Sequence, residues 1–146
     1  MRPLSSNDYK NGYLALLEQL TTVGDIHEIQ WKKTFDRMCN SGMYYVVVIE
    51  EINTHKIVGN STLFLEQKFI HNCVLRGRVE EVVVDKEYNG QGLGKALMTL
   101  LVALAEHLGV YKLSLECRPH LVGFYEQFGY KNDGGQYLVQ RFPRSD

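Results

Sequence analysis

The sequence predicts a single mixed α/β domain in which helices flank a central sheet. Its 146 residues match the size of one domain, and its 45% apolar content is enough for a core. Apolar residues recur at helical spacing in some segments and at strand spacing in others, with turn residues between them. Because the chain contains no repeat, low-complexity tract or linker-like stretch, we expect residues 1–146 to form one domain.

Two helices are expected before the sheet. Ser6 can cap the first, whose apolar residues recur every three or four positions across residues 9–20 and stop before Gly24. Asp25 and Glu28 resemble a capping box for the second, which continues to the stop signal at residues 40–42. Both helices could cover a sheet.

The remaining segments predict strands and two further helices. An Asn-Thr-His turn at residues 53–55 predicts that the strands on either side of it form an antiparallel hairpin. A helix that is apolar around most of its circumference is expected to be buried. The expected strands are 43–51, 56–66, 76–84, 112–117 and 136–142, and the expected helices are 93–108 and 121–128.

Charge and cysteine usage exclude several classes of protein. Sixteen basic and seventeen acidic residues give a net charge of −1, which does not favour a nucleic-acid partner. Cys39, Cys73 and Cys117 lack close-spaced pairs, so we expect neither a disulfide framework nor a metal site. The longest apolar run, residues 44–49, is too short for a transmembrane segment. A cytoplasmic protein is expected.

A glycine-rich turn follows the predicted strand 76–84. Gly90, Gly92 and Gly94 alternate directly before a buried helix, which lets backbone N–H groups approach an anion such as a diphosphate. The spacing excludes a P-loop and a dinucleotide fingerprint, because Asn89 and Lys95 stand where those motifs need glycine. The three glycines by themselves fit a flexible turn that binds no anion equally well, since glycine is the usual residue in tight turns.

Two longer segments carry a family resemblance. "VEEVVVDKEYNGQGLGKALM" and "LECRPHLVGFYEQFGYKN" together resemble the GCN5-related N-acetyltransferase (GNAT) superfamily over most of the chain. Within it, "LTTVGD", "EQKFIHNC", "RGRVEEVVVD", "YKLSLEC" and "VGFYEQFGY" resemble the glucosamine 6-phosphate N-acetyltransferase family most closely. The resemblance implies a mixed, mostly antiparallel, twisted sheet and acetyl-CoA as co-substrate. It also implies a homodimer in which Arg141 reaches the partner's substrate.

The sequence departs from the family pattern at three places. Asn89 stands where a longer glutamine or arginine begins the pyrophosphate motif, and Leu121 replaces a common asparagine near the CoA arm. The sequence ahead of the first expected helix leaves room for only a short first strand. We expect weakened side-chain contacts to CoA while the backbone cradle stays intact.

The implied reaction transfers acetyl from acetyl-CoA to the 2-amino group of glucosamine 6-phosphate by direct attack in a ternary complex, within UDP-N-acetylglucosamine biosynthesis. The resemblance assigns Tyr125 as the group serving the departing thiolate and Glu80 as a substrate or base residue. The implied cofactor contacts are Val82, Val83, Val84, Asn89, Gly90, Gln91, Gly92, Leu93, Gly94, Lys95, Tyr125, Glu126 and Gln127. The implied substrate contacts are Thr21, Lys68, Phe69, Ile70, His71, Glu80, Glu81, Tyr111, Lys112, Glu116 and Arg141.

The residues themselves support part of this assignment. Glu80 and Glu81 interrupt an apolar strand, and because neighbouring strand residues point to opposite faces, at least one carboxylate should line a cleft. An acidic pair at a sheet edge, bound to Arg76 or Arg78, is the alternative. Likewise Tyr125 could simply pack with Phe124.

Two other functions also stay open: acetylation of another small amine, such as a polyamine, arylalkylamine or peptide amine, and a non-catalytic acyl-CoA-binding module.

Overall fold

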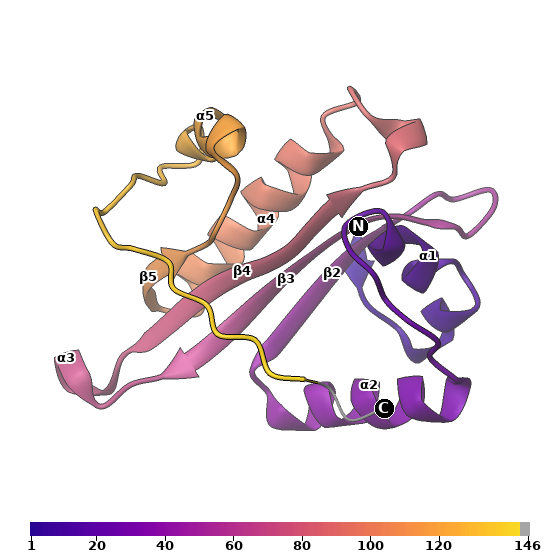
Figure 1. Ribbon diagram of the computed structural model, residues 1–146, viewed down its shortest axis with the longest axis horizontal. Helices are drawn as coiled ribbons and strands as arrows, with labels where there is room; N and C mark the ends of the chain where they lie inside the picture. The colour runs from indigo at the N-terminus through magenta and orange to yellow at the C-terminus, as the bar shows by residue number, and fades with distance from the viewer. Residues whose placement is uncertain (144–146) are drawn as a thin grey trace. The chain divides into compact units, whose positions relative to one another are not determined.

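The computed structural model describes residues 1–143, which divide into two compact units, residues 1–116 and 117–143. The first unit contains a five-stranded sheet in the order β1-β2-β3-β4-β5. Strands β1 to β4 are antiparallel and β5 runs parallel to β4, which confirms the mixed, mostly antiparallel sheet (Figure 1). Their bounds are β1 Arg2–Pro3, β2 Tyr44–Glu50, β3 Ile57–Gln67, β4 Leu75–Val84 and β5 Val110–Ser114.

Helices cover both faces of this sheet (Figure 1). The α4 helix, Leu93–His107, buries Leu97, Met98 and Leu101 completely on one face. On the other, α1 (Tyr13–Glu18) and α2 (Glu28–Ser41) pack an aromatic cluster around Trp31 against β2, β3 and β4. Sequence periodicity predicted all three helices, but not all of their ends.

The N-terminal helix predictions were wrong in detail. The first predicted helix is broken into a 3₁₀ turn, Ser6–Tyr9, and α1, because Gly12 between them has a left-handed φ of 81°. Ser5, not Ser6, caps the turn. The Asp25–Glu28 capping box is absent as well, since α2 begins after His27 without a side-chain cap.

Strand β5 begins two residues earlier than predicted and ends at Ser114. Gly77 makes its pairing with β4 possible, because a Cβ at that position would lie 2.8 Å from Leu113 Cδ1. A short turn, α3 (Ile70–Cys73), joins β3 and β4 and was not predicted from the sequence. The short first strand and the hairpin of β2 and β3 are confirmed.

The second unit contains a 3₁₀ turn, Pro119–Leu121, and α5, Val122–Glu126. The predicted strand over residues 136–142 is not formed, and Tyr137, Leu138, Val139 and Phe142 are exposed. A strand needs a neighbour for its backbone N–H and C=O groups, and the described chain offers this segment none. Alternating apolar residues predicted a strand, but periodicity does not reveal whether a partner strand exists.

Candidate active site

Strand β4 has an edge that its neighbour leaves open. Pairing with β5 begins at Leu75 and ends at Arg78 with Ser114, whereas β4 continues to Val84. The Asp85 amide donates to Val58 O on β3 at 2.8 Å. Because amides alternate in direction along a strand, those of Val82 and Val84 point to the opposite, open edge. The last part of β4 therefore presents free backbone donors to any group that enters beside it.

The glycine turn links this edge to α4. Gly90 and Gly92 have left-handed φ values of 79° and 76°, and a Cβ at either position would meet no atom within 4 Å. Gly92 is the N-cap of α4 and provides no side-chain hydrogen bond. The first helical bond runs from Ala96 N to Gly92 O at 3.0 Å, so three earlier helix amides stay free, at residues 93–95. This open cradle at the positive end of the helix dipole suits a phosphate anion.

Asp85 fixes the position of this turn. Its side chain is buried, accepts a hydrogen bond from Glu87 N at 3.0 Å and pairs with Lys56 Nζ at 2.8 Å. The hydrogen bond from Lys56 is the main reason why the pKa of Asp85 lies below its usual value. The turn therefore begins from a rigid, charge-paired anchor on the hairpin of β2 and β3.

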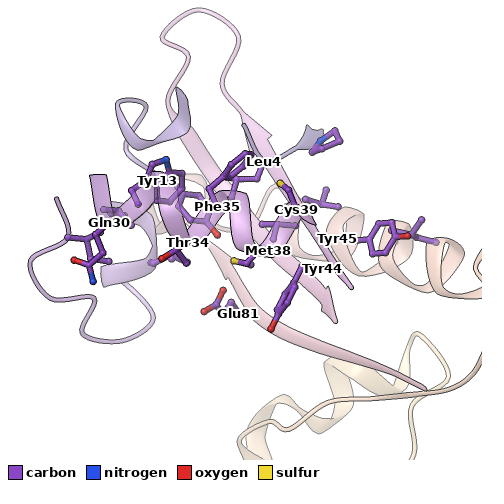
Figure 2. Close-up of a pocket in the computed structure, with 18 residues that line it drawn as sticks. Leu4, Tyr13, Gln30, Thr34, Phe35, Met38, Cys39, Tyr44, Tyr45 and Glu81 are labelled. Carbon is purple, nitrogen blue, oxygen red and sulfur yellow. The ribbon is translucent and has the colours of Figure 1, made fainter. Parts of the chain in front are cut away.

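A cavity of about 540 Å³ lies on the sheet face covered by α1 and α2. Its wall is mainly aromatic and aliphatic, and Glu81 contributes a carboxylate (Figure 2). Partial desolvation at the cavity wall, followed by the nearby charge of Glu80, raises the pKa of Glu81, although the residue is still exposed to solvent. The prediction that one carboxylate of the pair lines a cleft holds for Glu81. The sequence did not reveal the cavity wall, because residues such as Tyr13 and Trp31 have the spacing of ordinary core.

Glu80 has a different environment. Arg78 lies between two carboxylates, with Nε 3.0 Å from Glu80 Oε1 and Nη2 2.7 Å from Glu116 Oε1. The hydrogen bond to Glu116 is the largest contribution that raises the pKa of Arg78. Glu80 thus stands in the arginine-paired arrangement that the sequence left open as an alternative, and Arg78 brings Glu80 close to Glu116, another of the implied substrate contacts.

Further predicted substrate residues lie around the β3–β4 connection. Lys68 pairs with Glu66, which also lies 3.7 Å from Arg76, and the hydrogen bond from Lys68 lowers the pKa of Glu66. The ring of His71 lies 5.4 Å from that of Tyr111. Phe69, Ile70 and Lys112 are exposed, and so is Thr21, which lies apart from them directly after α1.

In the second unit, Tyr125 is buried within an aromatic group. Its ring lies 5.0 Å from that of Phe124 and 6.1 Å from that of Tyr130. Burial, followed by the charge of Cys117, raises the pKa of Tyr125, so the phenol keeps its proton at neutral pH. Glu126 ends α5, and Gln127 is its C-cap. Arg141 is exposed.

Comparison with known proteins identifies the family. The sequence profile described as "Acetyltransferase (GNAT) family" matches residues 12–130. The chain belongs to the GNAT family. A probable glucosamine 6-phosphate N-acetyltransferase of Drosophila melanogaster is 48% identical over 89% of this chain and 59% of its own length. The glucosamine 6-phosphate N-acetyltransferase of Candida albicans is 38% identical over 97% of this chain and 94% of its own.

Solved structures support the assignment of this chain to the GNAT family. The crystal structure of glucosamine-6-phosphate N-acetyltransferase from Arabidopsis thaliana matches with a TM-score of 0.92 and 32% identity, covering 97% of both chains. A Trypanosoma brucei acetyltransferase matches with a TM-score of 0.89 and 30% identity over 96% of this chain and 97% of its own. These matches confirm the fold that the sequence resemblance implied.

Residues 1–143 contain neither a membrane-spanning helix nor a metal-binding cluster. None of the helices described there has the length and apolar character needed to cross a membrane. Within the same residues, no three side chains of His, Cys, Asp or Glu are grouped where they could hold a metal ion.

Proposed function

We propose that this GNAT chain transfers the acetyl group of acetyl-CoA to the 2-amino group of glucosamine 6-phosphate. The observation that carries the proposal is the open edge of β4 leading into the uncapped, glycine-lined start of α4. The substrate is supported by relatives of that name, which are up to 48% identical to this chain. We also propose that the two units act as one catalytic domain, since the family profile spans both.

The residues present fit acetyl-CoA. Gly90 and Gly92 leave open space in front of free helix amides, as a pyrophosphate requires, and the amides of Val82 and Val84 can bind the pantetheine arm or the acetyl carbonyl. When bound, acetyl-CoA supplies the thioester carbon that the amine attacks. Asn89 is exposed, so the cradle depends on backbone groups and the short side chain at that position does not remove it.

The two neighbouring carboxylates suit different tasks. A glucosamine ammonium must lose a proton before it can attack, and Glu81, whose pKa is raised, is a stronger base than an ordinary carboxylate. Glu80 is held by Arg78 and suits binding of the sugar. We therefore propose Glu81 for the proton, directly or through water, and Glu80 for substrate binding.

The departing thiolate needs a proton or a hydrogen bond. The Tyr125 phenol keeps its proton at neutral pH, because burial raises its pKa. We propose Tyr125 as this donor, a role that typically contributes about 10²–10⁴-fold to the rate.

The sugar phosphate is a dianion and needs positive charge. Lys68 and Arg78 are already paired with carboxylates of the same unit, and Lys112, exposed on β5, carries a single charge, so a further cation would balance the dianion. We propose that Arg141 of a second copy supplies it in a homodimer. The exposed apolar residues of the segment 136–142 support this proposal, since a segment with strand periodicity and no partner strand among the described residues can pair with a second copy.

A substrate panel with acetyl-CoA, followed by thiol release, tests the function. Glucosamine 6-phosphate should be acetylated, while spermidine and a peptide amine should not. Acetylation of spermidine alone would favour the other-amine alternative. Tight CoA binding without turnover on any amine would favour a non-catalytic binding module.

A further inference from the structure

Strand β4 contains a β-bulge at the residues proposed for catalysis. Asn60 pairs with Val83 and Thr62 with Glu80, so one residue of β3 faces two residues of β4, Glu81 and Val82. The backbone of Glu81 is left-handed, with φ of 52°. Non-glycine residues rarely adopt this conformation, and surrounding structure must hold it. The bulge therefore needs an anchor.

Asn60 provides that anchor. Its side chain is fully buried, and Nδ2 donates to the backbone oxygen of Glu81 at 2.8 Å. In the described residues its Oδ1 has no hydrogen-bond partner. A buried polar group without a partner is costly, so a leucine would suit this place better if only packing mattered. The Nδ2 donor accounts for an asparagine at this position, because it binds the backbone carbonyl of the strained residue Glu81.

We propose that Asn60 is a positioning residue that holds Glu81 in the left-handed conformation. In this way it directs the Glu81 carboxylate into the cavity and keeps the Val82 amide on the open edge of β4. The inference rests on the proposed function, because it assigns Asn60 to the orientation of groups that serve acetyl transfer. Asn60 acts through Glu81 and Val82 and does not itself touch the substrates.

The variant N60L removes the donor with a larger apolar side chain that is also branched at Cγ, and N60D removes it with the same shape. T62V is the matched control, because Thr62 is also buried on β3 and its hydroxyl also lacks a partner in the described residues. Because small misplacements of catalytic groups can cost about 10²-fold, N60L should lower kcat by about that factor. The KM for glucosamine 6-phosphate should change less than threefold, and T62V should match the wild type.

Amide NMR spectra without substrates give a readout independent of turnover. N60L and N60D should shift the amide resonances of Glu81 and Val82, and T62V should not. In the E81G background the same N60L change should shift the Val82 resonance much less, since glycine adopts a positive φ without an anchor.

Three results would overturn the proposal: equal effects of N60L and T62V on kcat, an N60L shift of Val82 that is unchanged by E81G, or loss of fold in N60D. The last would assign Asn60 to the stability of the whole sheet. Because the spectra need no substrate, they test whether Asn60 holds the bulge even if the wild type fails to acetylate glucosamine 6-phosphate. That failure would refute only the proposed function.

Discussion

Replacing Gly92 by alanine tests the pyrophosphate cradle. Gly92 has a φ of 76°, and a Cβ would meet no atom within 4 Å, so the change adds backbone strain without a clash. An L-residue in this conformation costs about 1–2 kcal/mol. For a chain of this size, that loss lowers Tm by about 2–8 °C. If the turn moves to relieve the strain, the free amides of α4 change direction and bind the pyrophosphate less well. A loss of about 1–2 kcal/mol of binding free energy would raise the KM for acetyl-CoA by about 5- to 30-fold.

Gly42→Ala is the matched control. Gly42 also caps a helix, has a φ of 67° and faces open space, but it lies at the C-terminus of α2, outside the proposed cradle. Both variants should lose similar thermal stability in calorimetry, whereas only Gly92→Ala should raise the KM for acetyl-CoA in steady-state thiol-release assays. An equal rise in both variants, or a rise confined to glucosamine 6-phosphate, would refute the assignment of the turn to the pyrophosphate.

Three further predictions concern other parts of the chain. Tyr125→Phe should lower kcat by about 10²-fold or more while CoA affinity, measured by calorimetry, is retained; an unchanged kcat would exclude the phenol as proton donor. Arg141→Ala should raise the KM for glucosamine 6-phosphate far more than that for acetyl-CoA, and equal rises would contradict the phosphate assignment. Burial opposes the charge of Asp8, but hydrogen bonds from Arg2, the Ser5 amide and Asn11 outweigh it and lower its pKa below 3.8. The resulting stability is present above that pH and is lost as the pH falls toward the folded-state pKa. Asp8→Asn should therefore lower the free energy of unfolding by about 1.5–3 kcal/mol at pH 7. Below pH 4 the free energy of unfolding of the variant should change less with pH than that of the wild type, and an unchanged pH dependence would contradict this expectation.

Most of the fold could be predicted from the sequence, because the decisive signals are local. The apolar circumference of α4 and the turn between β2 and β3 each specify their element without distant information. The errors arise where a distant or backbone feature decides. Gly12 breaks the first predicted helix through a left-handed φ, and the segment 136–142 has strand periodicity but no partner in the described chain.

The candidate site was predictable in its motif and not in its geometry. The glycine spacing and the adjacent carboxylates could be identified in the sequence, whereas the cavity wall could not, because Tyr13 and Trp31 follow normal helix-core periodicity. Asn60 was not identified for a similar reason. A single polar residue in an apolar strand has many explanations, and only the contact with the Glu81 carbonyl distinguishes among them.

The two adjacent glutamates on β4 illustrate how backbone irregularity assigns chemistry. In a regular strand they would face opposite sides, and either could have served as base. The bulge places Glu81 at the cavity wall, where desolvation raises its pKa, while Glu80 keeps its ion pair with Arg78. Two carboxylates in different environments are suited to different tasks, one exchanging a proton and the other holding the substrate. Glu81→Gln should therefore lower kcat more than Glu80→Gln does, and Glu80→Gln should raise the KM for glucosamine 6-phosphate more than Glu81→Gln does. The reverse ranking in steady-state kinetics would show that the bulge does not decide which carboxylate takes the proton.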